Sequence, residues 1–555
     1  MRNLLLRSRY LLAIVAGLLL AASFPKIGIA GLAWIAPALM LVAAMGRGGW
    51  EAFRIGYVAG LAHYLASLYW LLLIPYRWHG IPFGPAAGWL ALSAFIALYP
   101  ATWVWLLSQV RCSMFDVRCS MFAVLPKTCL QRTLWSLSGA ALWVALEMLV
   151  ARLFTGFPWN LLGASQYQLL PLIQIASVTG IYGVSFLVVW ASLSLLSGAL
   201  VIIPRPQMRS AWIAEIILPL VVIVALFTFG LRQLRTPSIS TRTLKVTLVQ
   251  PSIPQTVIWE PDKDDERFAE LIRLSQQALS NRADLLIWPE AAVPKPLRYY
   301  HEMFDPIADL ARSNHVWIIV GADDAEQPLG STRREDRLYF NGSFLINPQG
   351  ELMDGYHKRA LVIFGEYIPL VRWLPFMKWF TPIEGQFTRG ERAVPFTLDN
   401  PKVKTSVLIC FEDIFPHLAR EYADDDTDFL VNLTNNGWFG EGAAQWQHAT
   451  SALFRAIENG LPLVRCSNNG LTCWVDEHGR LRQIFQNQNG AIYNPRFMTV
   501  EIPLLAYGEK RARTFYNQHG DWFGWGCVVI GAMMLLRKIP WRRTSFSSLS
   551  SFLKS

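Results

Sequence analysis

The chain has 555 residues, more than one hydrophobic core can hold, so at least two structural units are expected. Hydrophobic residues make up 53% and charged residues 16%, against about 25% charged in soluble proteins, which excludes a wholly soluble protein and indicates a membrane protein. The net charge of +10 does not indicate a nucleic-acid partner, because much of it lies in short loops between hydrophobic runs.

The first part of the chain is nearly continuous apolar sequence, and most of its runs supply about 20 residues, the length that crosses a bilayer core as a helix. Seven runs come first: Tyr10–Phe24, Ile27–Ala44, Ile55–Ile74, Ala86–Val110, Leu134–Phe154, Leu170–Ile203 and Trp212–Leu231. Trp522–Leu536 makes an eighth. We therefore predict a polytopic α-helical membrane domain of about eight transmembrane helices, seven in residues 1–231 and one in 519–538, followed by a tail in 539–555.

Basic residues gather in alternate loops of this part, and the positive-inside rule assigns such loops to the cytoplasm. They are Arg47, Arg54, Arg111, Arg118, Lys127, Arg132, Arg205 and Arg209, with Arg537, Lys538, Arg542 and Arg543 in the tail. The rule predicts a cytoplasmic N-terminus and tail. An odd number of spans then places residues 243–505 on the outer side of the membrane.

Residues 243–505 have the composition of a soluble enzyme, and short apolar runs alternate with helical patterns. Strands are expected at Leu244–Val249, Leu285–Trp288, Val316–Val320, Ser343–Ile346, Val403–Ile409, Phe429–Leu433, Leu463–Cys466 and Thr472–Val475. Helices are expected at Asp264–Ser280 and His448–Asn459. This alternation predicts an α/β domain with a mixed sheet covered by helices.

Three reactive residues end or follow such elements: Cys410 after the strand Val403–Ile409, Glu290 after Leu285–Trp288, and Lys358 after a hairpin. Each has an ordinary explanation when taken alone, as a buried core thiol, a solvated carboxylate and a surface lysine. Together they form a chemical set. A carboxylate can take the proton of a thiol nucleophile, and an ammonium can stabilise the thiolate and the oxyanion that its attack creates.

The motifs around these residues resemble a known family. WPE at Glu290, HK at Lys358, GEYIP at Glu366 and ICFE at Cys410, in this order, are similar to the Glu-Lys-Cys pattern of the nitrilase superfamily. Hydrophobic spans on both sides of such a domain resemble the membrane-embedded branch of that superfamily, the apolipoprotein N-acyltransferases. Further matches are QPSIPQTVIWEP, NGSFLI around Asn341 and VNLTNNGWFG. The resemblance implies an α/β nitrilase-like αββα sandwich.

The resemblance also implies a reaction and site roles. Cys410 would attack a phospholipid ester with Glu290 as base, and Lys358 with the backbone N–H of Phe411 would hold the oxyanion. The thioester on Cys410 would then pass its acyl chain to the N-terminal amine of an S-diacylglyceryl-cysteine, the final step of bacterial lipoprotein maturation. Glu366 and Glu412 would support the site, and the residues expected to bind substrate are Trp259, Trp438 and Asn436.

The partners implied are a phospholipid acyl donor, a diacylglyceryl lipoprotein acceptor and the membrane itself. The protein is expected in the bacterial inner membrane with its catalytic domain in the periplasm. The seven cysteines form no CxxC pair and no Cys/His cluster at zinc spacing, so neither a metal nor a cofactor is expected. Nothing in the sequence demands an oligomer, and a monomer is expected.

Two other functions stay open at this point. The first is a membrane-tethered carbon-nitrogen hydrolase (an amidase) that uses the same three residues with water as the second nucleophile. The second is a non-catalytic lipid- or lipoprotein-binding membrane protein. A disulfide between Cys466 and Cys473, on what would be the oxidising side, is also open.

Overall fold

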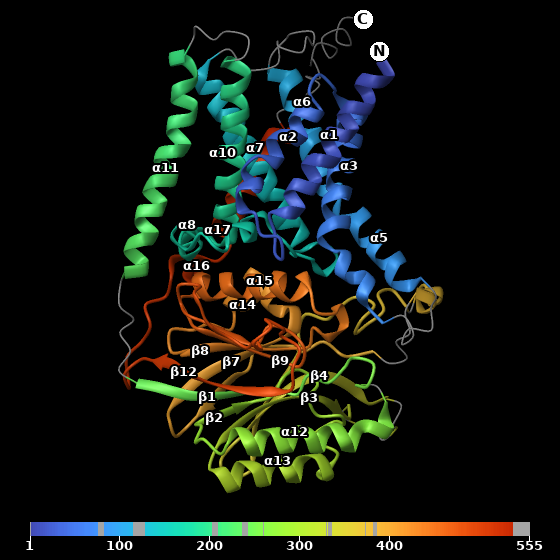
Figure 1. Cartoon of the computed structure of the whole chain (residues 1–555), viewed down its shortest axis with the longest axis vertical. Coiled ribbons are helices and arrows are strands. Elements are labelled where there is room, and N and C mark those ends of the chain that lie inside the picture. Colours follow the sequence, from blue (N-terminus) through green and yellow to red (C-terminus); the bar gives the residue numbers. More distant parts are fainter. Residues whose placement is uncertain are drawn as a thin grey trace, which may run out of the picture.

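The structure is a computed structural model that describes residues 2–75, 83–114, 128–202, 209–235, 242–258, 260–328, 330, 333, 336–371, 373–380 and 386–536. A helical part and a β-rich part lie end to end along the long axis (Figure 1). The polypeptide starts at the end of the helical part that lies farthest from the sheets (Figure 1).

The helical part combines long apolar helices with short ones. Its helices are α1 (Arg2–Ala22), α2 (Ala36–Ala43), α3 (Gly49–Ser67), α5 (Gly84–Ile96), α6 (Leu98–Met114), α7 (Cys129–Val150), α8 (Leu170–Ile173), α9 (Ala176–Thr179), α10 (Ile181–Ile202), α11 (Arg209–Arg235) and α17 (Trp522–Leu536). Among the described residues, four segments are long and apolar enough to cross a membrane: 84–109, 129–150, 181–202 and 215–235. These four helices fit a helical membrane domain, while the number of eight spans stays a prediction.

Two of the expected spans are interrupted. The run Ile27–Ala44 contains only the 3-10 turn η1 (Ala30–Trp34) and the eight-residue helix α2. Eight residues of helix rise about 12 Å, less than half of the hydrocarbon thickness. The run Leu170–Ile203 is divided into α8, α9 and α10, and α9 ends at Gly180, whose φ is +67°. Glycine adopts this left-handed conformation at little cost.

One of the expected loop charges lies inside the helical part. Arg132 is buried in the first turns of α7 and forms an ion pair with Glu215 of α11. The hydroxyl of Ser197, on α10, donates a hydrogen bond of 2.5 Å to the other oxygen of Glu215. Three helices are therefore tied together by one buried charge pair, and Arg132 is not a free loop charge.

The β-rich part is a sandwich of two six-stranded sheets, as the αββα expectation requires. The first sheet has the order β12-β1-β2-β3-β4-β5 and the second β11-β10-β9-β8-β7-β6. The first sheet contains β1 (Arg242–Gln250), β2 (Leu285–Ile287), β3 (Trp317–Glu326), β4 (Leu338–Ile346), β5 (Leu352–His357) and β12 (Arg496–Leu504). The second contains β6 (Pro395–Leu398), β7 (Val403–Ile409), β8 (Phe429–Thr434), β9 (Leu463–Ser467), β10 (Cys473–Val475) and β11 (Leu481–Ile484).

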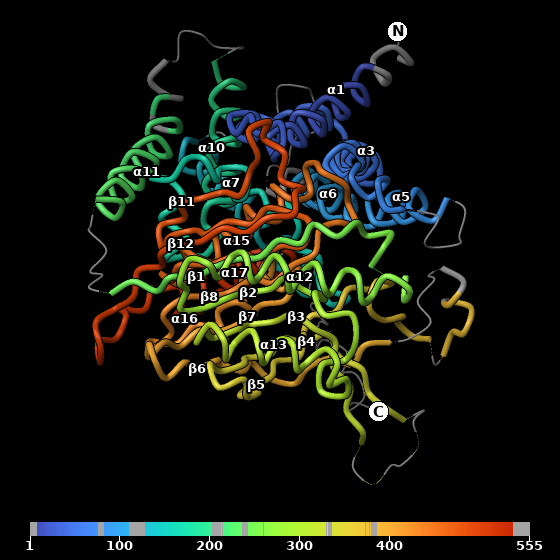
Figure 2. The backbone as a smooth tube through the Cα atoms, turned by 60° about the horizontal axis from the view of Figure 1, so that its bottom comes forward, coloured from blue at the N-terminus to red at the C-terminus, as the bar shows by residue number. Residues whose placement is uncertain are grey.

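Helices cover both outer faces of the sandwich. The helices α12 (Asp264–Ala278) and α13 (His301–Asn314) lie on the first sheet, at the end of the molecule opposite the membrane helices (Figures 1 and 2). The helices α14 (Pro416–Arg420) and α15 (Ala443–Asn459) lie between the second sheet and the helical part, followed along the chain by α16 (Phe515–His519). The expected strands are confirmed, and β5 is the second strand of the hairpin expected before Lys358. The elements α13, β6, β11 and β12 had not been expected.

The two cysteines considered for a disulfide are both free and buried. Cys473 of β10 is paired with Arg465 of β9, so Cys466 is one position out of register with it. Side chains alternate between the faces of a strand, and the two thiols therefore point to opposite faces. The Cys466 thiol donates to the carbonyl oxygens of Val249 and Ile287 in the first sheet, at 3.4 Å each.

Gln447 of α15 is the main polar contact between the two parts. Its side-chain oxygen accepts hydrogen bonds from the indole N–H groups of Trp70 (3.1 Å) and Trp159 (2.8 Å). Its amide donates to the carbonyl oxygens of Pro25 (2.8 Å) and Ser67 (3.2 Å). One buried amide thus satisfies four groups from three separate segments of the helical part.

We expect Gln447→Ala to destabilise the junction by about 2–4 kcal/mol, because it leaves several buried polar groups without partners. The thermal unfolding midpoint of the detergent-solubilised protein would measure the effect. Gln168→Ala is the matched control, since that exposed side chain donates only to Tyr167. Equal midpoints for the two variants would contradict the role assigned to Gln447.

Candidate active site

Cys410 stands where β7 ends and a 3-10 turn, η8 (Cys410–Ile414), begins. Its φ of +53° lies in the left-handed region, which costs a non-glycine residue about 1–3 kcal/mol and is found mostly at functional sites. The side-chain amide of Asn432, on the neighbouring strand β8, donates a hydrogen bond of 2.8 Å to the Cys410 carbonyl oxygen and holds this conformation. The half-buried thiol is thereby presented at the carboxyl end of a parallel strand pair.

Lys358 lies between two carboxylates. Its ammonium nitrogen is 3.1 Å from Oε1 of Glu290 and 2.8 Å from Oε1 of Glu366, and its side chain is only 1% exposed. Burial by itself would lower the pKa of Lys358, but the two carboxylates outweigh it and raise the pKa well above the ordinary value. The lysine is therefore an ammonium in the resting site.

Every oxygen of the two carboxylates is satisfied. The side-chain amide of Asn341, on β4, donates to Oε1 of both Glu290 and Glu366 at 2.9 Å. The other oxygen of Glu290 accepts from the backbone N–H of Asn435 (2.9 Å), and that of Glu366 from the N–H of Val362 (2.8 Å). Four donor groups, the Lys358 ammonium, the Asn341 amide and two backbone N–H groups, fix the two carboxylates through six hydrogen bonds. This is the kind of preorganisation that catalysis requires.

The thiol is protonated at rest. Burial, followed by the charge of Glu290, raises the pKa of Cys410 to about 12, although Lys358 and a hydrogen bond to Thr434 act in the opposite direction. A cluster of two carboxylates and one ammonium has a net charge of −1, so it can accept a proton when the sulfur attacks. Among the charged groups, Glu290 has the largest effect on the pKa of Cys410.

Glu412 ties the two halves of the site together. Its fully buried carboxylate accepts hydrogen bonds from the backbone N–H groups of Ile409 (2.7 Å), Arg359 (2.6 Å) and Ala360 (2.9 Å), and from the hydroxyl of Tyr356 (2.8 Å). The end of β7 and the segment after Lys358 are thus clamped by one side chain. Burial raises the pKa of this carboxyl.

The other expected site residues occupy different positions. The half-buried ring of Phe411 packs edge to face against Phe415, with ring centres 5.2 Å apart. Asn436 is buried, and its side-chain oxygen lies 3.1 Å from Nδ1 of His448. Trp438 is half-buried in the turn η9 (Gly437–Phe439). Trp259 lies outside the described residues. The oxyanion role of Phe411 and the substrate-binding roles of Trp259, Trp438 and Asn436 stay predictions.

Two residues that donate hydrogen bonds to the site carboxylates, Asn341 and Asn435, had been assigned no role from the sequence. Both belong to segments quoted for the family resemblance, so the motifs NGSFLI and TNNGW were the available signal. A buried cluster around Asp413, in the turn that begins at Cys410, had also not been expected. The Asp413 carboxylate is 2.8 Å from Nε2 of His448 and 2.5 Å from Nη1 of Arg465, and all three side chains are buried.

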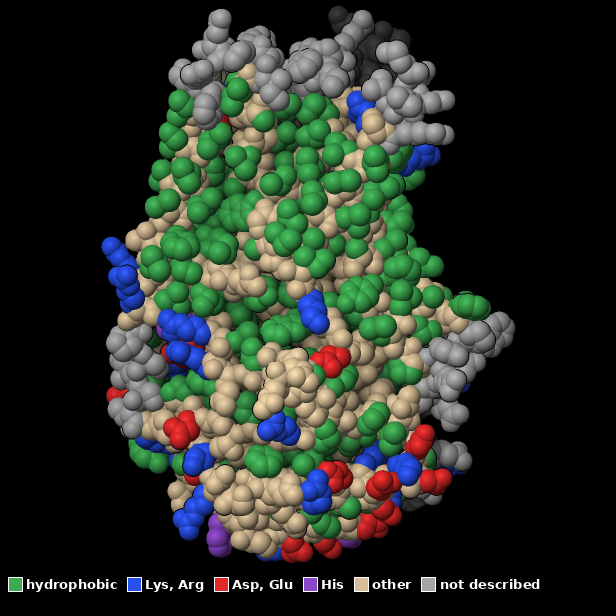
Figure 3. Space-filling view, viewed as in Figure 1, with side chains coloured by type: hydrophobic (Ala, Val, Ile, Leu, Met, Phe, Trp, Pro, Cys, Tyr) green, Lys and Arg blue, Asp and Glu red, His purple; other side chains and the backbone are tan. Residues whose placement is uncertain are grey.

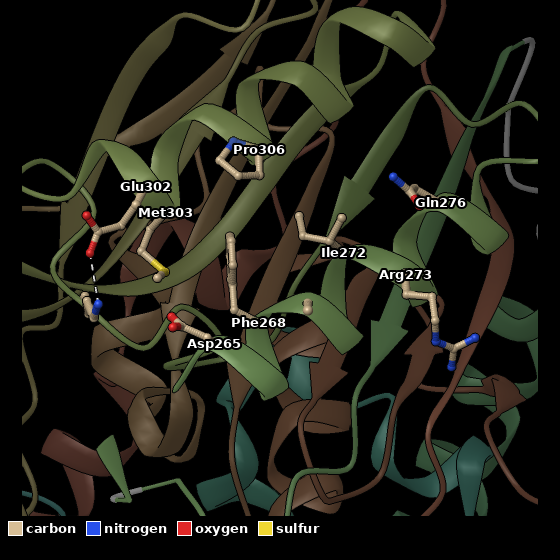
Figure 4. A pocket seen from close by; sticks show the side chains of 10 residues that line it. Asp265, Phe268, Ile272, Arg273, Gln276, Glu302, Met303 and Pro306 are labelled. Atoms are coloured by element: carbon tan, nitrogen blue, oxygen red, sulfur yellow. Dashed lines mark hydrogen bonds and ion pairs between the residues drawn. The ribbon is translucent and has the colours of Figure 1, made fainter. Parts of the chain in front are cut away.

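Two other features do not belong to this site. A hollow of about 480 Å³ lies between α12 and α13, with Phe268, Ile272, Met303 and Pro306 forming its apolar lining (Figure 4). It is on the outer face of the first sheet, away from the second sheet that carries Cys410 (Figure 1). Ligand atoms of Asp324, Glu326 and His357 lie within 4.8 Å of one another. Arg298 pairs with both carboxylates, so an ion-pair network explains their proximity.

Comparison with known proteins separates the chain into the same two parts. Residues 16–194 match the model of the apolipoprotein N-acyltransferase N-terminal domain, and residues 245–497 match that of the carbon-nitrogen hydrolases. The apolipoprotein N-acyltransferase of Geobacter metallireducens is 36% identical over 541 residues, covering 96% of each chain. The chain belongs to the apolipoprotein N-acyltransferase family.

More distant members of the family also match most of the chain. The apolipoprotein N-acyltransferase of Rickettsia prowazekii is 30% identical and covers 78% of this chain and 80% of its own. That of Vibrio vulnificus is 29% identical and covers 93% and 94%. Among solved structures, an amidase of the nitrilase superfamily from Nesterenkonia AN1 is 17% identical, with a TM-score of 0.35, covering 48% of this chain and 93% of that chain.

The charges around Cys410 predict how its reactivity changes with pH. Glu290→Gln removes a carboxylate that raises the thiol pKa and leaves Lys358, which lowers it. We expect the inflection in the rate of alkylation by iodoacetamide to move to lower pH. Turnover should nevertheless fall by at least about 10²-fold, because Glu290 is the expected base. Intact-mass spectrometry would follow the modification.

Cys410→Ala supplies the background from the other cysteines, and Asp354→Asn removes a carboxylate that does not act on the thiol. An inflection in Glu290→Gln that stays in place or moves to higher pH would contradict the arrangement of charges described here.

Proposed function

We propose that the protein transfers an acyl chain from a phospholipid to the N-terminal amine of S-diacylglyceryl-cysteine on an apolipoprotein, with Cys410 carrying the chain as a thioester. Membership of the family supports an acyltransferase with a lipoprotein substrate, an acyl donor and a membrane setting. The observation that carries the mechanism is the buried ammonium of Lys358 held between Glu290 and Glu366, in electrostatic contact with the Cys410 thiol.

In the first half-reaction the Cys410 sulfur attacks the ester carbonyl carbon of the phospholipid while Glu290 takes the thiol proton. The ammonium of Lys358 and the N–H of Phe411 stabilise the oxyanion. The carbon–oxygen ester bond then breaks, and Glu290 returns the proton to the departing alkoxide of the lysophospholipid. A thioester remains on Cys410.

In the second half-reaction the amine of the acceptor attacks the thioester carbonyl, forms an amide bond and releases the sulfur. Glu290 takes a proton from the attacking nitrogen and returns it to the Cys410 thiolate, which restores the resting site. Exclusion of water protects the thioester between the two steps.

The approach of lipid is supported by apolar side chains on the segment that follows Glu366. Leu370, Trp373 and Phe376 are 62%, 83% and 45% exposed. They belong to the segment Val371–Ile383 and its immediate neighbour, which the sequence suggests as an arm that dips into the bilayer; residues 372 and 381–385 lie outside the described residues. We propose that this segment guides the acyl chains toward the site.

We also propose the inner membrane of a bacterium as the location, with the N-terminus in the cytoplasm, eight spans, residues 243–505 in the periplasm and Trp438 and Asn436 near the substrate. On the face drawn in Figure 3, apolar side chains cover the helical part and charged side chains gather on the β-rich part, as a protein half embedded in lipid requires. The protein is proposed to act as a monomer.

Incubation of the purified protein with phospholipid and no acceptor tests this proposal. We expect intact-mass spectrometry to show a gain of one acyl chain that hydroxylamine removes and that is absent in Cys410→Ala. A diacylglyceryl-cysteine peptide should then discharge the adduct. Acylation of the alanine variant would refute the role of Cys410.

Two other results would favour the alternative functions. An unmodified protein that hydrolyses small amides would indicate the amidase. A protein that shows neither the adduct nor hydrolysis, but binds the lipopeptide, would indicate a non-catalytic binding protein.

A further inference from the structure

Asp323 of β3 lies on the face of the first sheet that carries the carboxylate–ammonium cluster. It is directly opposite Asn341 in the antiparallel pairing of β3 and β4. Residues opposite each other in such a pair point to the same face, with their Cβ atoms about 5 Å apart. Because the side chain of Asn341 reaches Glu290 and Glu366, the side chain of Asp323 points toward the same site.

Gly321 independently shows what this face of β3 meets. A Cβ atom on Gly321 would lie 2.1 Å from the carbonyl oxygen of Pro289 and 2.8 Å from the Cα atom of Glu290. Asp323 is two residues further along, on the same face. Asp324 points the other way, where its carboxylate is 2.7 Å from Nε2 of His357. Asp323 therefore lies on the face of β3 that meets the backbone at Glu290, whereas Asp324 belongs to a separate ion-pair network on the other face.

The carboxyl group of Asp323 is half-buried, and within the part of the chain that the structure describes no side chain or backbone donor is hydrogen-bonded or ion-paired to it. The charged groups that act on it are Glu366, Glu290 and Arg267 of α12, together with Asp324 on its own strand. Burial and, to a smaller extent, the two glutamates raise the pKa of Asp323, Arg267 opposes them, and the pKa lies at about 7. Near neutral pH this group both takes up and releases a proton.

The second half-reaction has two protons to remove. The α-amino group of an acceptor has a pKa of about 8 and arrives as an ammonium, which cannot attack a carbonyl carbon until it has lost one proton. The attacking nitrogen loses a second proton as the amide forms. Glu290 accounts for only one of these, because it must return that proton to the Cys410 thiolate.

We propose that Asp323 is the subsite for the α-ammonium group of the acceptor and takes its first proton. This inference rests on the proposed acyl-transfer function. The Asp323 carboxylate binds the ammonium by charge and accepts one N–H proton, which leaves the neutral amine to attack the thioester. The protonated Asp323 then releases this proton to solvent, while Glu290 carries the second proton to sulfur. The subsite has no part in the first half-reaction, since a phospholipid ester brings no ammonium to the reacting carbon.

Separate measurement of the two half-reactions tests the subsite. In Asp323→Asn we expect formation of the acyl-enzyme from phospholipid within about twofold of the wild-type rate, because Glu290 still supplies the base. Discharge by a diacylglyceryl-cysteine peptide should slow by about 10²-fold, the usual loss for a positioned proton acceptor. The pH profile of discharge should also move to higher pH, toward the pKa of the free amine.

Hydroxylamine is the control nucleophile, because it is neutral at pH 7 and needs no ammonium site. We expect it to discharge the wild-type and Asp323→Asn thioesters at equal rates, and Asp323→Glu to restore part of the peptide reaction. Glu326→Gln is the matched control variant, since it also removes one carboxylate from β3. The Glu326 side chain lies on the opposite face of the strand from Asp323 and is paired with Arg298. Asp323→Ser serves as a second variant if the asparagine variant does not fold.

If the peptide discharges the thioester of Asp323→Asn at the wild-type rate, Asp323 is not the subsite for the ammonium group. Equal slowing of hydroxylamine and peptide would overturn it as well, because Asp323 would then only position the cluster. A wild-type protein that forms no acyl-enzyme at all would overturn acyl transfer and the subsite with it, and this outcome is visible before any acceptor is added.

Discussion

The structure of the site depends on one buried ammonium. Lys358 is almost completely removed from water, and an ammonium in such a place is stable only with anionic partners and filled hydrogen bonds. Its partners come from segments that follow different strands of the first sheet, Glu290 after β2 and Glu366 after β5. The N–H that holds Glu290 belongs to Asn435, which follows β8 of the second sheet. The cluster therefore exists only when the two sheets face each other in one register.

The nucleophile is held from the other side by the layer that joins the sandwich to the membrane helices. Neighbouring residues of α15 point in two directions: Gln447 binds segments of the helical part, and His448 binds Asp413 in the turn of Cys410. The ring of Trp159, from the helical part, lies 5.3 Å from that of His448. Membrane docking and nucleophile geometry are thus connected through two adjacent side chains. These contacts join the sandwich to the bundle of apolar helices.

The charges divide the chemistry between separate groups. A thiol whose pKa is about 12 is not a ready thiolate, so in the proposed mechanism Glu290 accepts its proton as the sulfur attacks a bound ester. The raised pKa of Lys358 suits the role proposed for it, which is to stabilise the oxyanion and not to transfer a proton. Asp323 has its own pKa near neutrality, which suits the proposed binding of a substrate that arrives positively charged.

The sequence by itself determined the apolar runs, most strands of the sandwich and the three reactive residues, because buried strands need continuous apolar sequence and the motifs are local. The strand Val403–Ile409 has the predicted bounds. Only the tertiary structure decided how residues distant in sequence meet. The break at Gly180, the pairing of Arg132 with Glu215, and the placement of Asn341, Asn435 and Asp323 beside Glu290 depend on helix packing, strand register and the contact of two sheets. Such contacts leave no periodic signal in the chain, since each is fixed by residues that lie far along the sequence.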